Sequence, residues 1–105
     1  MSNIYFSLTS SFLKALAHPT RLKILEQLKN EDELCVCHIY EDLDLEQSNV
    51  SQHLKVLRDQ GILISRKDGL KVMYSIRHRE VLDIIDLVKH ALHNQLKEDQ
   101  KHFEV

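Results

Sequence analysis

Apolar residues recur at helical spacing through the first third of the chain. The first predicted helix is marked by four of them: Leu8, Phe12, Leu13 and Leu16. It must end before Pro19, because proline is tolerated in the first turn of a helix but not inside one. A second amphipathic helix is expected to begin at Pro19 and to close at the polar run 29–32. A short third helix is expected over about Val36–Leu43.

A fourth helix is predicted after the turn DLEQ, capped by Gln47 or Ser48, running to about Gln60 and ended by Gly61. Its inward face consists of apolar residues at positions i, i+4 and i+7: Val50, Leu54 and Leu57. The polar side chains between them are then expected to face outwards.

The apolar period then changes from that of a helix to that of a strand. ILISR and LKVMYSI predict two strands of a hairpin, with Asp68 and Gly69 in its turn. From about Arg79 the helical period returns, with one apolar stripe: Val81, Ile84, Ile85, Val88 and Leu92. The predicted fold is mainly α with a small β-hairpin (α+β), in the order α-α-α-α-β-β-α.

The composition is that of one small globular domain spanning residues 1–105. The chain is 43% hydrophobic and 29% charged, with only 2 Gly and 1 Pro, which excludes disordered and collagen-like classes. We find no glycine-rich phosphate loop and no set of nucleophile, base and orienting residue, so we do not expect an enzyme. No apolar run approaches the length of a membrane span, and the start lacks the pattern of a secretory signal, so we expect a cytoplasmic protein without a membrane partner.

The net charge of −2 hides an uneven distribution along the chain. Segment 26–46 contains eight acidic residues and one basic residue, whereas segment 48–79 contains seven basic and two acidic residues. The second segment therefore offers a basic surface to a polyanion, although a solvated charged surface would look the same.

A short helix, a tight turn and a second helix with a polar outer face form a helix-turn-helix, which places its second helix in the major groove of DNA. The outward residues expected to contact DNA are Gln47, Ser48, Asn49, Ser51, Gln52, Lys55 and Arg58. Asn and Gln can pair with adenine, and Lys and Arg bind phosphate or guanine. His53 lies beside them, and it either joins this face or packs at the edge of the core.

The predicted hairpin resembles the wing of a winged helix-turn-helix. Arg66 and Lys67 are expected at its tip and Lys71 just beyond, where they would contact phosphates or the minor groove, unless the tip is simply polar.

One such module buries too little surface for tight specific binding to DNA. Two modules related by a twofold axis would read a palindrome, so we assign the last stripe and the first helix to a homodimer interface. The alternative is that the stripe closes its own core.

Two kinds of residue are candidates for metal chemistry. Cys35 and Cys37 are expected to be thiols in a reducing cytosol, and at a helix start both can bind one thiophilic ion, such as arsenite, Cd, Pb or Zn. The alternative is two small buried apolar side chains.

His90 and His93 share one helical face with Asp83 and Asp86, where they would hold zinc with help from a symmetry mate, or be plain surface residues.

Four segments together resemble the ArsR/SmtB family of metal- and metalloid-responsive repressors: ELCVCHI, HPTRLKIL, QSNVSQHLKVLRDQGIL and SRKDGLKVMYSI. The resemblance runs from about residue 8 to residue 95. It implies a winged helix homodimer that binds operator DNA in the free state, blocks transcription, and releases the DNA when an inducer binds.

Carried over by position, Cys35 and Cys37 match the thiol pair of the family. Tyr40 stands where arsenic sensors often have a third Cys, and His90 and His93 match half of the zinc site on the last helix. The main hypothesis is a repressor that a thiophilic ion releases from DNA through Cys35 and Cys37. The alternatives are zinc sensing through the two histidines, a redox or persulfide thiol sensor, and a protein-interaction or metal-buffering module with no operator.

Overall fold

The computed structural model describes residues 2–103, so residues 1, 104 and 105 of the predicted domain lie outside the described part. Within that part the order of the elements is α1 (Ser2–Leu16), α2 (Pro19–Leu28), β1 (Leu34–Cys35), α3 (Val36–Leu43), α4 (Gln47–Asp59), β2 (Leu63–Asp68), β3 (Lys71–Ile76) and α5 (Glu80–Phe103). The predicted helices and hairpin are confirmed. The strand β1 was not predicted, because two residues are too few to show an alternating pattern.

The three strands form an antiparallel sheet in the order β1-β3-β2. In β2 and β3 the pairing ends at Asp68 opposite Lys71, which leaves Gly69 and Leu70 as a two-residue turn. Gly69 has φ of 63°, which a glycine in a tight hairpin turn adopts without strain. Our placement of Arg66 and Lys67 at the tip was wrong, since this register puts both within β2.

The ends of α4 differ in how well they were predicted. Gly61, with φ of 74°, follows the helix as expected. The N-cap is Glu46 rather than Gln47 or Ser48, and the Glu46 side chain makes no capping hydrogen bond. The reason lies in the preceding turn, where Asp44, the C-cap of α3, is left-handed and the backbone is extended at Glu46.

The core is built from one face each of α2, α3, α4 and the sheet, which together form the body of the domain. Val50, Leu54 and Leu57 of α4 are completely buried, together with side chains of α2 and α3. The outer helices join this core at the ends nearest the body, through Leu16 of α1 and Val81 of α5. Each buried side chain contributes about 1.5–3 kcal/mol of hydrophobic stabilisation, so the buried face of α4 is a large share of the fold's stability.

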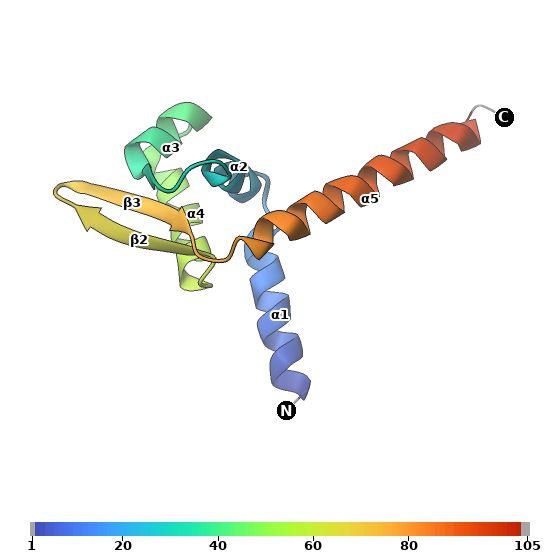
Figure 1. The fold of residues 1–105 in the computed structure, drawn as a ribbon, viewed down its shortest axis with the longest axis horizontal. Coiled ribbons are helices and arrows are strands. Elements are labelled where there is room, and N and C mark those ends of the chain that lie inside the picture. Colours follow the sequence, from blue (N-terminus) through green and yellow to red (C-terminus); the bar gives the residue numbers. More distant parts are fainter. Residues whose placement is uncertain (1, 104–105) are drawn as a thin grey trace.

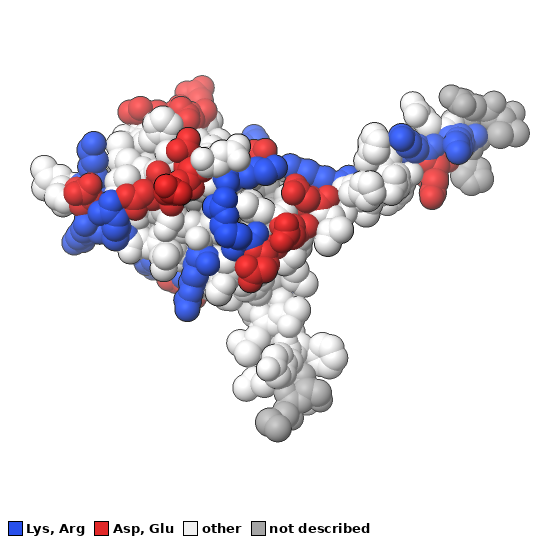
Figure 2. Space-filling model, viewed as in Figure 1, with Lys and Arg blue, Asp and Glu red and all other residues white. Residues whose placement is uncertain are grey.

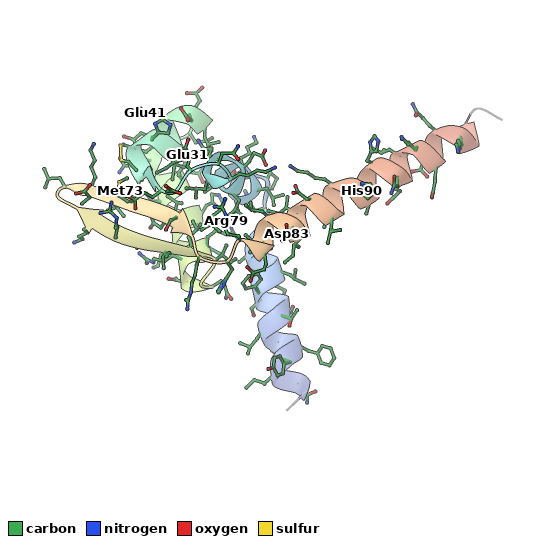
Figure 3. The ribbon with its side chains drawn as sticks, viewed as in Figure 1. Glu31, Glu41, Met73, Arg79, Asp83 and His90 are labelled. Atoms are coloured by element: carbon green, nitrogen blue, oxygen red, sulfur yellow. A yellow bond between two sulfur atoms is a disulfide. The ribbon has the colours of Figure 1, made fainter. Side chains whose placement is uncertain are left out.

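Helices α1 and α5 project from the body in different directions, as Figure 1 shows. The radius of gyration is 16.5 Å, whereas a compact domain of this length has about 13 Å. Arg79, labelled in Figure 3, anchors the start of α5, because its Nη2 donates to the Lys29 carbonyl at 2.6 Å. No helix between residues 2 and 103 has the combined length and apolar character that crossing a membrane requires.

The predicted apolar stripe of α5 divides between two environments. Val81 is buried and Ile84 and Ile85 are half-buried against the core, whereas Val88 and Leu92 are 54% and 51% exposed. Other large apolar side chains on the projecting parts of α1 and α5 are also exposed: Ile4, Tyr5, Phe6, Leu8, Leu13, Leu87 and Leu96. The inner part of the stripe thus closes the core, and the outer part stays open.

We expect Leu54→Ala to lower the free energy of unfolding by about 2–5 kcal/mol, because it leaves a cavity in the core beneath α4. Lys55→Ala, one residue further along the same helix and exposed, should change it by no more than about 0.5 kcal/mol. Urea denaturation at one fixed protein concentration measures both, and equal effects would contradict the burial described above.

Candidate nucleic-acid interface and thiol site

The outer face of α4 is polar because its apolar face is fully used by the core. All seven side chains predicted to face outwards are exposed: Gln47, Ser48, Asn49, Ser51, Gln52, Lys55 and Arg58. They provide amide, hydroxyl and cationic groups along one helix, which is the chemistry that base edges and phosphates require. The structure therefore brings these residues together on one accessible surface.

His53 does not belong to this outward face. Its side chain is half-buried, its Nδ1 accepts a hydrogen bond from Arg21 Nε at 3.1 Å, and its ring centroid lies 4.2 Å from that of His18. Burial, followed by the nearby His18 and Arg21, lowers the pKa of His53. This position corresponds to the alternative in which His53 packs at the edge of the core.

The hairpin carries exposed basic side chains, which lie among acidic ones at the left of Figure 2. Lys67, near the end of β2, and Lys71, at the start of β3, are exposed. Arg66 instead pairs with Glu33, with its Nε 2.8 Å from Oε2 and its Nη2 in contact with Oε1. This bidentate pair lowers the pKa of Glu33, chiefly through the hydrogen bond from Arg66.

Cys35 and Cys37 are joined by a disulfide beside α3, drawn in yellow in Figure 3. We expected two free thiols here, and the structure corrects this. Cys35 is the N-cap of α3 with an extended backbone, so its side chain does not follow helical geometry and meets that of Cys37, with the two Cα atoms 5.2 Å apart. The Cys35 sulfur also accepts a hydrogen bond from the Cys37 backbone N–H at 3.2 Å.

The strand β1 connects the cysteine segment to the wing. Leu34 pairs with Tyr74 and Cys35 pairs with Met73 of β3. Figure 3 labels Met73 on the hairpin, near the disulfide. The pair formed by Glu33 and Arg66 adds a second link between this segment and the hairpin. Sequence reasoning missed both links, because neither strand pairing nor a contact across 33 residues leaves a local pattern.

The side chains near the two sulfurs that could ligate a metal ion are already paired with other residues. Glu33 pairs with Arg66, and His38 Nε2 lies 3.0 Å from Asp42 of the same helix. Across the described residues, no group of three or more His, Cys, Asp or Glu is placed to hold a metal ion. Any ion at Cys35 and Cys37 therefore needs further ligands from a rearrangement, a small molecule or a second copy of the chain.

His90 and His93 are exposed on the projecting part of α5, where Figure 3 labels His90. The expected grouping with Asp83 and Asp86 does not form a site of three ligands within residues 2–103. Spacing along a helix places side chains on one side of the axis, but residues two turns apart are also separated along it. Within one chain, His90 and His93 thus supply at most two of the ligands that the predicted zinc site needs.

An apolar groove with a volume of about 490 Å³ lies between α1, α2 and α5. Its walls include Leu13, Leu22 and Val88, which are all exposed. At its edge, Lys89 Nζ lies 3.4 Å from Glu26 Oε2. The groove combines the first and last helices, the two elements predicted to form an interface.

A short helix, a turn, a second helix with a polar outer face and an adjacent basic hairpin define the winged helix-turn-helix class of DNA-binding regulators. Comparison with known proteins agrees. Residues 18–65 match the family model "Bacterial regulatory protein, arsR family".

Two curated relatives and one solved structure extend the match. The chain is 41% identical to the cadmium resistance transcriptional regulatory protein CadC of Listeria innocua, over 74% of this chain and 66% of that protein, just under two thirds of its length. It is 42% identical to the arsenical resistance operon repressor of Staphylococcus xylosus, over 73% of this chain and 72% of that protein. The solution structure of the homodimeric winged helix-turn-helix DNA-binding domain Mb0332 from Mycobacterium bovis superposes with a TM-score of 0.80 and 25% identity, over 92% of this chain and 89% of that one.

The chain belongs to the arsR family of bacterial regulatory proteins. Its relatives are transcriptional regulators rather than enzymes, and the family binds DNA.

We expect Arg66→Gln to raise the pKa of Glu33 towards its ordinary value, because the hydrogen bond and the charge that lower it are removed. Carbon-13 NMR titration of the Glu33 carboxyl group measures this shift. Lys67→Gln, next to Arg66 but outside the pair, should leave the titration of Glu33 unchanged. An unaltered titration in Arg66→Gln would show that the pair does not persist in solution.

Proposed function

We propose that this protein is a dimeric, cytoplasmic transcriptional repressor that releases operator DNA when a thiophilic metal or metalloid ion binds Cys35 and Cys37. One observation carries the proposal. Cys35 belongs both to β1, which pairs with the wing, and to the N-cap of α3, which packs against α4. A ligand at the two sulfurs therefore acts where both DNA-facing elements are attached to the body.

In this proposal α4 lies in the major groove and the wing contacts the adjacent backbone. The exposed amides and hydroxyls of α4 contact base edges, while Lys55, Lys67 and Lys71 neutralise phosphates. Arg66 keeps its bond to Glu33, so it holds the wing against β1 instead of contributing a free charge. The basic segment that the net charge conceals is the part that faces the DNA.

The apolar groove and the exposed outer parts of α1 and α5 support a homodimer. A monomer would leave these apolar side chains in water, whereas a twofold-related copy would cover them. Two recognition helices related by such an axis contact half-sites about 34 Å apart, one turn of DNA. The relative Mb0332, described as homodimeric, has the same arrangement of elements.

The donor set at the start of α3 fits a soft ion once the disulfide is reduced. Reduction adds two electrons and two protons and gives two thiols, and a low-molecular-weight thiol supplies these in a reducing cytosol. The Cys37 N–H and the N-terminus of α3 then favour negative charge on the Cys35 sulfur. Thiolates prefer arsenite, Cd, Pb or Zn over oxygen-seeking ions, and the names of the cadmium and arsenical relatives support this class.

Release from DNA requires that the sulfurs change the attachment of the wing or of α4. Drawing Cys35 and Cys37 around one centre, with Glu33 or His38 recruited as a further ligand, would break a pair that exists in the free state. Loss of the Glu33 bond frees Arg66 and loosens the wing from β1. A coupling of about 1.4 kcal/mol changes DNA affinity tenfold, so a few such contacts are sufficient.

The disulfide favours a second candidate, a redox sensor at the same two residues. Oxidation of two thiols by a peroxide forms the bond between the sulfurs, and the two electrons and two protons reduce the peroxide. The oxidised and reduced proteins would then differ in DNA affinity without any metal. Zinc sensing through His90 and His93 stays a prediction, with no contact in the described chain that favours it.

We expect Lys71→Ala to lower the salt dependence of DNA binding by about one in the slope of log Kd against log salt, because one phosphate contact is lost. Lys97→Ala removes a charge of the same sign from the outer part of α5 and should leave the slope unchanged. Fluorescence anisotropy with a labelled duplex, selected from a random library by the wild-type protein, provides the measurement. A protein that retains no duplex in the selection would contradict the proposed function.

We expect arsenite or Cd(II) to release the reduced wild-type protein from this duplex with at least about a tenfold loss of affinity, and to have no effect on Cys35→Ser/Cys37→Ser. His90→Ala/His93→Ala serves as the matched control and should respond like the wild type. Release of the oxidised, metal-free wild type would instead support the redox sensor. Equal release of wild type and the serine variant by every ion would overturn the thiol mechanism.

A further inference from the structure

Arg21 occupies a corner where three helices meet. It lies in the first turn of α2, where a cation is disfavoured by the helix dipole, so its place calls for other contacts. Its Nη1 donates to the carbonyl oxygens of Ala15 at 3.3 Å and Lys14 at 3.5 Å, at the C-terminal end of α1. Its Nε donates to His53 Nδ1 of α4 at 3.1 Å. One side chain thus joins the end of α1 to the recognition helix.

These contacts specify the protonation of His53. A guanidinium group has only donors, so Nδ1 of His53 must accept and carries no proton. His18, whose ring is 4.2 Å from that of His53, is restricted in the same way, because its Nδ1 accepts from the Thr20 backbone N–H at 3.0 Å. The corner therefore contains one permanent cation and two imidazoles that accept hydrogen bonds.

We propose that Arg21 and His53 are positioning residues that hold α4 at a defined angle to α1, and that this hold is lost when His53 is protonated. The inference rests on the proposed function, because it concerns how the recognition helix is placed on DNA. If α1 forms the dimer interface, the same link sets the orientation of one recognition helix relative to the other. None of these side chains needs to touch DNA for the effect.

Charge at the corner gives the proposal its pH dependence. Burial is the largest cause that lowers the pKa of His53. The charged or titratable groups that add to it are His18, at the cap of α2, and Arg21, on α2 itself. The folded protein then binds fewer protons than the unfolded chain. The contribution to stability is present above the ordinary pKa of histidine and is lost as the pH falls through the lowered value.

The test compares DNA binding of the full-length wild type and His53→Asn between pH 7.5 and pH 5.5, with the selected duplex, reductant and no metal. Asparagine places an oxygen near the position of Nδ1 and accepts from Arg21 but does not titrate. We expect the affinity of the wild type relative to this variant to fall by about tenfold over this range, the factor that one hydrogen bond to a charged group represents. The other six histidines are present in both proteins, so the comparison isolates the exchange at position 53.

Two further variants complete the design. His78→Asn removes an exposed histidine outside the corner and should keep the wild-type pH profile. Arg21→Gln should weaken DNA binding at pH 7.5 while its far-UV circular dichroism remains that of a folded protein. Identical pH profiles for wild type and His53→Asn would overturn the proposal, even if both bind DNA. Absence of DNA binding by the wild type at every pH would instead count against the proposed function.

Discussion

Burial of a single face of α4 is the constraint on which the rest of this structure depends. Val50, Leu54 and Leu57 are completely shielded from water, and three such side chains account for a large part of the stability of a small domain. With that face committed, the polar residues of the helix have nowhere to lie but outside. The polar surface that we propose to contact DNA is thus a direct consequence of the packing beneath it, and the fold cannot keep its core and hide those residues.

The body is held together by contacts that also connect its functional parts. Two residues of β1 add a third strand to the hairpin, and the bond from Arg66 to Glu33 supports the same junction from the other strand. Cys35 stands at the end of this strand and at the beginning of α3. In the proposed mechanism, a chemical change at a sulfur atom there would reach the wing through the pairing of β1 with β3 and would reach α4 through the packing of α3.

The outer helices α1 and α5 leave several large apolar side chains exposed. Their body-side ends complete the core through Leu16 and Val81, and their outer parts carry apolar side chains into water. A domain of this size buries a smaller fraction of its surface when it folds than a larger domain does. Covering the exposed apolar side chains with a twofold-related copy would therefore increase its stability. The corner around Arg21 joins the end of α1 to α4, so in the proposed repressor it links the dimer interface to the recognition helix.

The periodicity of the sequence alone was sufficient to predict the helices, the hairpin and the outward face of α4, because burial of one face leaves a repeating local pattern. Residue type and spacing also singled out Cys35 and Cys37, the two cysteines of the chain. Tertiary structure decided what those residues contact: the extended backbone that brings the sulfurs together, the pairing of β1 with β3, the bond of Arg66 to Glu33, and the placement of His53 against Arg21. Apart from the two neighbouring cysteines, these contacts join residues far apart in the chain, and their geometry exists only once the elements have packed.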